Sequence, residues 1–307
     1  MILILGITGS GKGKLAFDLA ESLGAEIISI DSMKVYRRMD IGTAKPSKEA
    51  RARIKYHLID IIEPSDSFSV GAFMDAASNG IERIKSRNKE IIAVGGTALY
   101  IKSMIYGLFE DAGTNEQIRT ALRARAEAEG LAELYRELTK IDPVAANRIN
   151  PNDSRRIIRA LEVYQITGKP ISSLQRQWDR SRTKYDWKII GLRREKTDAN
   201  RRINKRVKKM ILAGLINEVK SLLDEEKPLS KQARCAIGYA EIIEYLKGQM
   251  NLKDATELIK KNTRRLAKSQ RTWFKTFKDI HWIDIKPDEP AEKTLNLTKR
   301  LLADILA

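Results

Sequence analysis

A glycine-rich loop near the N-terminus constrains the fold of this chain more than any other feature. Residues Gly6-Ile7-Thr8-Gly9-Ser10-Gly11-Lys12 follow the apolar run Ile2–Leu5 and precede the helical pattern of Lys14–Ala20. A strand, a glycine-rich turn and a helix in this order form a phosphate-binding loop, in which backbone N–H groups, the helix N-terminus and a lysine converge on phosphate oxygens. We therefore expect this loop to bind a phosphorylated ligand.

One position of the loop departs from the usual motif. The residue after the lysine is normally Ser or Thr, whose hydroxyl binds Mg²⁺, whereas here it is Gly13. Either the metal is held in another way or its binding is weak. The loop alone leaves open whether the ligand is a nucleoside triphosphate or another diphosphate.

Further apolar runs predict buried strands at Glu26–Ile30, Tyr56–Ile62, Glu90–Val94, Lys188–Leu192 and Ile280–Ile283. Helical patterns alternate with them, which indicates an α/β fold with a P-loop NTPase-like core and a mostly parallel sheet. From 115 to 185 no strand is predicted, and helices are expected at Glu116–Glu129, Leu131–Ile141 and Asp153–Thr167. We predict a catalytic core of residues 1–114 and 186–307, and an all-helical insertion domain of residues 115–185.

The positive charge is concentrated in two stretches. The chain carries a net charge of +17; residues 176–209 contain fourteen Lys or Arg against four acids, and residues 260–278 contain eight against none. A local excess of this kind indicates a surface for a polyanion. In the second stretch, helical spacing places Lys260, Arg264, Lys268, Arg271, Lys275 and Lys278 on one face. The same spacing places Ile259, Leu266, Trp273 and Phe277 on a face expected in the core.

Other protein classes fit poorly. Cys235 is the only cysteine, which excludes an internal disulfide, and with His57 and His281 far apart a Cys/His zinc site is not expected. No apolar run is long enough to span a membrane, and Met1–Gly6 carries no charged segment typical of a signal peptide. We expect a cytoplasmic protein that does not bind membranes.

Besides the phosphate loop, the chain contains a series of separate motifs: Asp31–Arg37, Asp40–Pro46, His57–Asp60, Val94–Tyr100, Asn150–Asp153, Arg159–Val163, Gly168–Pro170, Ile237–Tyr239 and Gln270–Phe274. In order along nearly the whole chain, these motifs resemble those of the bacterial tRNA dimethylallyltransferases (tRNA isopentenyltransferases, the IPP transferase family). The resemblance implies transfer of a dimethylallyl group from dimethylallyl diphosphate to N6 of adenosine 37, beside the tRNA anticodon. It also implies Mg²⁺ as cofactor, an expectation that Gly13 weakens, and we expect a monomer because the partner is a large RNA.

The resemblance assigns a role to each candidate site residue. Asp31, at a predicted strand end, becomes the base that deprotonates N6; from the residues alone a Mg²⁺ ligand or a helix cap is equally open. Thr97 lines the tunnel where base and donor meet, and Arg206 binds the leaving diphosphate. The diphosphate is held by Gly6, Ile7, Thr8, Gly9, Ser10, Gly11, Lys12, Gly13 and, in support, Arg202. The tRNA anticodon stem-loop is bound by Asp31, Ser32, Met33, Lys34, Arg119, Arg155, Arg156, Arg159, Cys235, Gly238 and Tyr239.

Four positions depart from the family pattern: Gly13 replaces Ser or Thr, Lys34 replaces Gln, Ala240 replaces a basic residue, and Ser269 interrupts a Lys-Arg-Gln run. Two other functions therefore stay open. A phosphate-loop kinase for a small metabolite is disfavoured by Gly13 and leaves the basic patches without a role. A tRNA-binding relative with impaired catalysis is compatible with the departures.

Overall fold

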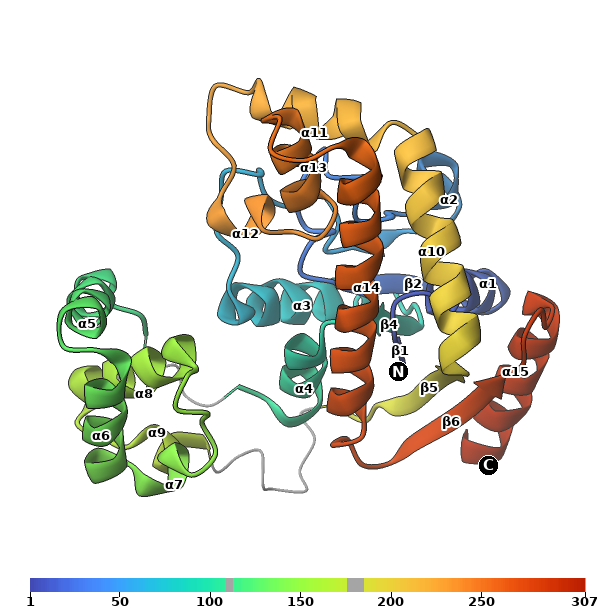
Figure 1. Cartoon of the computed structure of the whole chain (residues 1–307). Helices are drawn as coiled ribbons and strands as arrows, with labels where there is room; N and C mark the ends of the chain where they lie inside the picture. The colour runs from blue at the N-terminus through green and yellow to red at the C-terminus, as the bar shows by residue number, and fades with distance from the viewer. Residues whose placement is uncertain (109–112, 176–184, 307) are drawn as a thin grey trace. The chain divides into compact units, whose positions relative to one another are not determined.

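The protein is represented by a computed structural model that describes residues 1–108, 113–175 and 185–306 (Figure 1). It contains one six-stranded sheet with the strand order β3-β2-β4-β1-β5-β6. The strands are β1 (Ile2–Gly6), β2 (Glu26–Ile30), β3 (Tyr56–His57), β4 (Ile91–Gly95), β5 (Lys188–Arg194) and β6 (Ile280–Ile285). Every neighbouring pair is parallel, which confirms the predicted α/β class.

Two compact units make up the chain. The larger comprises residues 1–105 and 185–307, and the smaller comprises residues 106–184. The larger unit contains the sheet and the helices α1 (Lys12–Leu23), α2 (Lys48–Arg53), α3 (Val70–Lys85), α10 (Lys196–Leu212), α11 (Leu215–Leu223), α12 (Lys231–Arg234), α13 (Tyr239–Leu246), α14 (Leu252–Phe274) and α15 (Ala291–Leu306). Helix α4 (Ala98–Tyr106) ends at the boundary between the units.

The central strands are buried on both faces, as expected for a parallel sheet covered by helices. Ile2 and Ile4 of β1 pack with Leu15 and Leu19 of α1 and with Leu302 of α15. Helix α3 contacts β2 and β4, and α14 lies against β1 (Figure 1). Because all the strands run in the same direction, the loops that follow β1, β2, β4 and β5 emerge at one edge of the sheet, where ligands bind in open α/β sheets.

The smaller unit is helical where it is described. It contains α5 (Glu116–Ala128), α6 (Leu131–Ile141), α7 (Pro143–Ala146), α8 (Ser154–Thr167) and α9 (Ile171–Leu174), around a core of its own. Asp153 accepts a hydrogen bond from the Arg156 N–H and caps α8, and Gly168 ends this helix with a φ of 68°. The three helices predicted from the sequence are present. A tRNA-binding role for this unit stays a prediction.

Two predictions about local structure are wrong. The strand expected at Tyr56–Ile62 ends at His57, because Leu58 and Asp60 adopt φ angles of 62° and 55°, which break an extended strand. The amphipathic pattern of residues 259–278 also differs from prediction. Helix α14 ends at Phe274, before Lys275 and Lys278, and Lys260 is buried whereas Leu266 is exposed. In the part of the chain that the structure describes, no helix combines the length and apolar character needed to cross a membrane.

Candidate active site

The phosphate loop connects β1 to α1. Gly9 and Gly11 have φ angles of 82° and 101°, which side chains with a Cβ rarely adopt. Ser10 is fully buried, and the Lys12 ammonium donates to the Ile7 carbonyl at 3.3 Å. In the first turn of α1 the Lys14 N–H donates to the Gly11 carbonyl at 3.0 Å and the Lys12 N–H to Ser10 Oγ at 3.4 Å. The Gly13 N–H has no acceptor among the described residues, so it is available to an anion.

Two arginines hold the loop from outside. Arg194, at the end of β5, donates from Nε to the Ser10 carbonyl at 2.9 Å, and Arg202 of α10 donates to the Gly9 carbonyl at 2.9 Å. Arg194 also forms a buried ion pair with Asp198 at 2.9 Å. Arg202 therefore supports the loop through its backbone and also lines the cavity described below.

Gln270 of α14 joins the phosphate loop to the turn after β4. Its Oε1 accepts a hydrogen bond from the Thr8 N–H at 2.8 Å, and its Nε2 donates to the Gly96 carbonyl at 2.8 Å. The side chain is 8% exposed. A Cβ at Gly96 would lie 2.5 Å from Gln270 Nε2, so a glycine is needed for this close approach.

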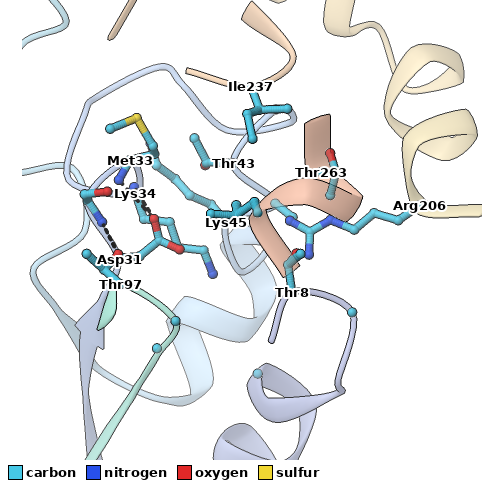
Figure 2. A pocket seen from close by; sticks show the side chains of 18 of the residues that line it. Thr8, Asp31, Met33, Lys34, Thr43, Lys45, Thr97, Arg206, Ile237 and Thr263 are labelled. Carbon is cyan, nitrogen blue, oxygen red and sulfur yellow. Dashed lines mark hydrogen bonds between the residues drawn. The ribbon is translucent and has the colours of Figure 1, made fainter. Parts of the chain in front are cut away.

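Asp31 follows β2 and is oriented by the backbone. Its Oδ1 accepts hydrogen bonds from the N–H groups of Met33 and Lys34, at 2.9 and 3.3 Å (Figure 2). Thr97 accepts one from the Ser32 N–H at 3.1 Å, which links the turns after β2 and β4. Asp31 Oδ2 accepts no hydrogen bond from the described residues, so one carboxylate oxygen is fixed and the other is open to a ligand.

These turns surround one cavity of about 1060 Å³ in the larger unit (Figure 2). Its lining includes Asp31, Thr97, Gln270 and the phosphate loop, as well as the exposed Cys235. The basic side chains that line it are Lys12, Lys14, Lys34, Lys45, Arg202, Lys205, Arg206 and Lys209. Asp31 is the single carboxylate among the described lining residues. The cavity is therefore suited to an anionic ligand.

The cationic side chains of the cavity repel one another. Burial lowers the pKa of Lys12 to about 7, with further contributions from Lys34 and Arg206 that exceed the opposing effect of Asp31. Burial also lowers the pKa of Lys34 and that of Arg206, and Asp31 opposes both shifts. A bound anion would relieve this repulsion.

A half-buried carboxylate, Glu218, holds two parts of the cavity lining, Gly42 and Tyr239. Glu218 of α11 accepts hydrogen bonds from the N–H groups of Asp40, Ile41 and Gly42 at 3.0, 2.7 and 3.1 Å. It also accepts one from the Tyr239 hydroxyl at 2.6 Å, and the Tyr239 side chain is fully buried. Tyr239, predicted to contact tRNA, is thus placed to hold Glu218 and the loop at residues 40–42.

A magnesium ion does not fit the donors that this site offers. Gly13 supplies no hydroxyl, and Asp31, the single lining carboxylate, is surrounded by cationic side chains. Mg²⁺ in proteins is held through carboxylates and hydroxyls together with substrate phosphates. No three His, Cys, Asp or Glu side chains converge anywhere in the described ranges.

Comparison with known proteins identifies the family. A sequence model described as IPP transferase matches residues 34–277. The chain belongs to this IPP transferase family. A tRNA dimethylallyltransferase of Geobacter metallireducens is 44% identical over 284 residues, 92% of each chain. One of Halothermothrix orenii is 44% identical over 307 residues, 100% of this chain and 93% of the relative.

Solved structures of IPP transferases agree with this membership. The tRNA isopentenylpyrophosphate transferase of Bacillus halodurans is 39% identical, with a TM-score of 0.73 over 99% of this chain and 95% of that one. A eukaryotic dimethylallyltransferase acting on tRNA is 27% identical, with a TM-score of 0.82 over 99% of this chain and 79% of that one.

The arginines predicted to bind tRNA in the smaller unit of this IPP transferase fall into two groups. Arg155 and Arg156 are exposed at the start of α8, where Arg156 pairs with Asp153 at 3.3 Å. Arg119 and Arg159 instead donate to the buried Glu162, at 3.0 and 2.9 Å. Arg119 and Arg159 therefore also stabilise the unit.

Sequence reasoning missed four residues that shape the site: Arg194, Glu218, Gln270 and Lys45. The ammonium of Lys45 is held by Asp40 and Asp60, at 2.7 and 2.5 Å. Arg194 could have been found, because it lies two residues after the predicted strand Lys188–Leu192. Lys45 and Gln270 lie in the motifs Asp40–Pro46 and Gln270–Phe274, but the resemblance assigns no role to these two side chains. Glu218 acts through contacts distant in sequence, for which no local pattern exists.

Proposed function

We propose that this IPP transferase moves a dimethylallyl group from dimethylallyl diphosphate to N6 of adenosine 37 in tRNA, giving N6-dimethylallyladenosine and diphosphate. The observation that carries the proposal is that the phosphate loop and the open oxygen of Asp31 face one cavity. Such a cavity can hold a diphosphate at one end and a nucleophile at the other. Family membership supplies the reaction class.

The diphosphate end is formed by the phosphate loop, Lys12 and Arg206. As the bond between C1 of the prenyl chain and its oxygen breaks, negative charge develops on the leaving diphosphate. Cations and N–H groups already in position stabilise this charge more than they stabilise the ground state. Arg194 and Gln270 keep the loop in place through hydrogen bonds with its backbone.

The acceptor end is formed by Asp31. The adenine N6 is a weak nucleophile, and it loses a proton as its bond to C1 forms. Asp31 Oδ2 accepts that proton, while the N–H groups of Met33 and Lys34 hold Oδ1. Thr97, tied to the same turn through the Ser32 N–H, lines the passage between base and donor.

The remaining lining suits the prenyl chain and an extruded base. Leu266 and Trp273, expected in the core, line the cavity instead, together with Met33 and Ile237. Apolar walls exclude water from the reacting centre. Removing an adenine from its stack costs a few kcal/mol, which stacking in such a pocket offsets.

The RNA partner is supported by charge. Lys268 on α14 and Arg155 and Arg156 on α8 are exposed basic side chains. They can contact phosphates of an anticodon stem-loop. A monomer in the cytoplasm is sufficient for this reaction.

The test uses labelled dimethylallyl diphosphate and unmodified tRNA, with nucleoside mass analysis of the product. We expect label in N6-modified adenosine. ATP hydrolysis without prenyl transfer would identify a small-metabolite kinase instead. Tight tRNA binding without transfer would identify a catalytically impaired relative.

A further inference from the structure

The phosphate loop has room for the side chain that it lacks. A Cβ built at Gly13 meets no atom within 4 Å, and its backbone has no positive φ. A serine hydroxyl would therefore fit where phosphate-loop proteins bind Mg²⁺. Lack of space does not explain why position 13 is a glycine. Another positive charge in the cavity could instead neutralise the phosphates.

Lys34 is a cation without a partner in the same cavity. Its ammonium forms no ion pair within the described residues, whereas Lys45 is held by Asp40 and Asp60. Asp31, the one carboxylate that influences Lys34, is opposed there by Arg206 and Lys45. A half-buried ammonium that lacks a counter-ion is costly, and this cost falls when an anion binds. Lys34 is thus prepared for a negatively charged ligand.

The positive charge of Lys34 also acts on Lys12 of the phosphate loop. Lys34 and Arg206 both contribute, after burial, to the lowered pKa of Lys12, so all three cations lie within electrostatic range of one another. Arg202, by contrast, already donates a hydrogen bond to the Gly9 carbonyl. Lys12, Lys34 and Arg206 line the same cavity and form no ion pair with the described residues, so they can contact a diphosphate.

We propose that Lys34 replaces the divalent metal of this site, so that Lys12, Lys34 and Arg206 neutralise the donor diphosphate and Mg²⁺ is not required. The inference rests on the proposed function and deepens it by naming what stabilises the leaving group. The side-chain ammonium would supply to the diphosphate the positive charge that Mg²⁺ supplies in other phosphate-loop proteins. Lys34 is therefore a ligand of the diphosphate rather than only a reader of the RNA.

The first test measures binding without chemistry. Inorganic diphosphate is titrated calorimetrically into the whole protein, without RNA, in EDTA and then in Mg²⁺. We expect similar affinity in both conditions for the wild type. Lys34→Gln should lose about tenfold or more in both conditions, roughly the effect of one charge-assisted contact, because the site still lacks the hydroxyl that would bind Mg²⁺. The exposed Lys208 lies outside the cavity lining, so Lys208→Gln is the charge-matched control and should show no such pattern.

Restoring the hydroxyl gives a reciprocal test. In Lys34→Gln combined with Gly13→Ser, we expect diphosphate binding to become strictly Mg²⁺-dependent, since the serine side chain has space. Wild-type binding that collapses in EDTA, or Lys34→Gln that matches Lys208→Gln, would overturn the proposal.

Prenyl transfer is then measured with an anticodon stem-loop hairpin, which folds in monovalent salt and removes the Mg²⁺ requirement of whole tRNA. We expect wild-type transfer to persist in EDTA. Transfer that occurs only with Mg²⁺ refutes the role of Lys34 but leaves the proposed function standing. No transfer in either condition, with the hairpin bound, refutes the proposed function itself.

Discussion

Gln270 Oε1 accepts a hydrogen bond of 2.8 Å from the backbone N–H of Thr8, although the two residues are 262 positions apart in the chain. The same amide donates to the Gly96 carbonyl. One buried side chain thus fixes the distance between the loop that holds the diphosphate and the turn that carries Thr97. Helix α14, near the C-terminal end of the chain, therefore completes a site that begins at the first strand.

Replacing Gln270 should impair donor binding. Gln270→Ala leaves the Thr8 N–H and the Gly96 carbonyl without partners, at about 1–3 kcal/mol each, and we expect kcat/KM for the donor to fall at least ~10-fold. Gln270→Glu should be equally impaired, because its second oxygen faces the Gly96 carbonyl. Asn251→Ala, which removes the cap at the far end of α14, is the control. It should lower stability by ~1 kcal/mol without changing the donor KM. Equal KM changes in both variants would refute the positioning role.

Asp31→Asn should separate catalysis from RNA binding. The amide oxygen can still accept from the Met33 and Lys34 N–H groups, but the base is lost, so we expect kcat to fall by ~10²–10⁴. The Kd for tRNA should change little. Asp18→Asn, at a carboxylate on α1 outside the cavity lining, is the matched control. Parallel losses in kcat and tRNA affinity would mean that Asp31 serves binding rather than proton transfer.

Donor binding should take up a proton at alkaline pH. The pKa of Lys12 in the empty site is about 7, below its ordinary 10.5, because of burial and the charges of Lys34 and Arg206, with Asp31 opposing. At pH 8 the amine is mostly neutral, and a bound diphosphate raises its pKa, so affinity falls as pH rises above 7. Calorimetry in two buffers of different ionisation enthalpy, with dimethylallyl diphosphate and no RNA, measures the uptake. A binding enthalpy that is the same in both buffers, or proton uptake that persists in Lys12→Gln, would contradict this prediction.

The basic side of α14 should contribute to RNA affinity. Lys268 is exposed and Arg271 partly exposed. Lys268→Gln with Arg271→Gln should weaken tRNA binding and reduce the slope of log K against log salt by about 1–2. Lys299→Gln with Arg300→Gln, a pair of exposed cations on α15, should change the slope less. The same slope in both double variants would show that this side of α14 does not meet RNA.

Glu162 should stabilise the smaller unit above acidic pH. Burial alone would raise the pKa of Glu162, but hydrogen bonds from Arg159, the Asn115 N–H and Arg119 outweigh burial and lower it. The stabilisation is then complete above the ordinary pKa near 4.5 and is lost as pH falls through the lower folded value. Glu162→Gln should cost about 3–5 kcal/mol at pH 7, measured by chemical denaturation. A variant as stable as wild type would show that the arginines need no counter-ion.

The sequence predicts the architecture well because strand ends in a parallel sheet share an edge. Asp31, Thr97 and the phosphate loop follow β2, β4 and β1. Because these strands are parallel neighbours, the segments that follow them meet at the same edge of the sheet. Helical periodicity is less informative for α14. Leu266 and Trp273 line a cavity, and a pattern of apolar residues does not distinguish a core from the wall of a ligand site.

Contacts between distant segments escape prediction for a different reason. The hydrogen-bond partners of Gln270, Glu218 and Arg194 include backbone groups of other elements: Gln270 and Arg194 donate to carbonyls, and Glu218 accepts from N–H groups. Backbone groups carry no sequence signature, so these contacts appear only in three dimensions. Tyr239 shows the same limit, since its motif indicates a functional segment but not that its ring is buried against Glu218.

The most direct measurement places the modification in the RNA. The protein is incubated with dimethylallyl diphosphate and an anticodon stem-loop that carries adenosine at position 37, and with an otherwise identical hairpin that carries guanosine there. Fragment mass analysis should find one dimethylallyl group, on adenosine 37 of the first hairpin, and none on the second. A prenyl group at another base, or no product while both hairpins bind, would contradict the account.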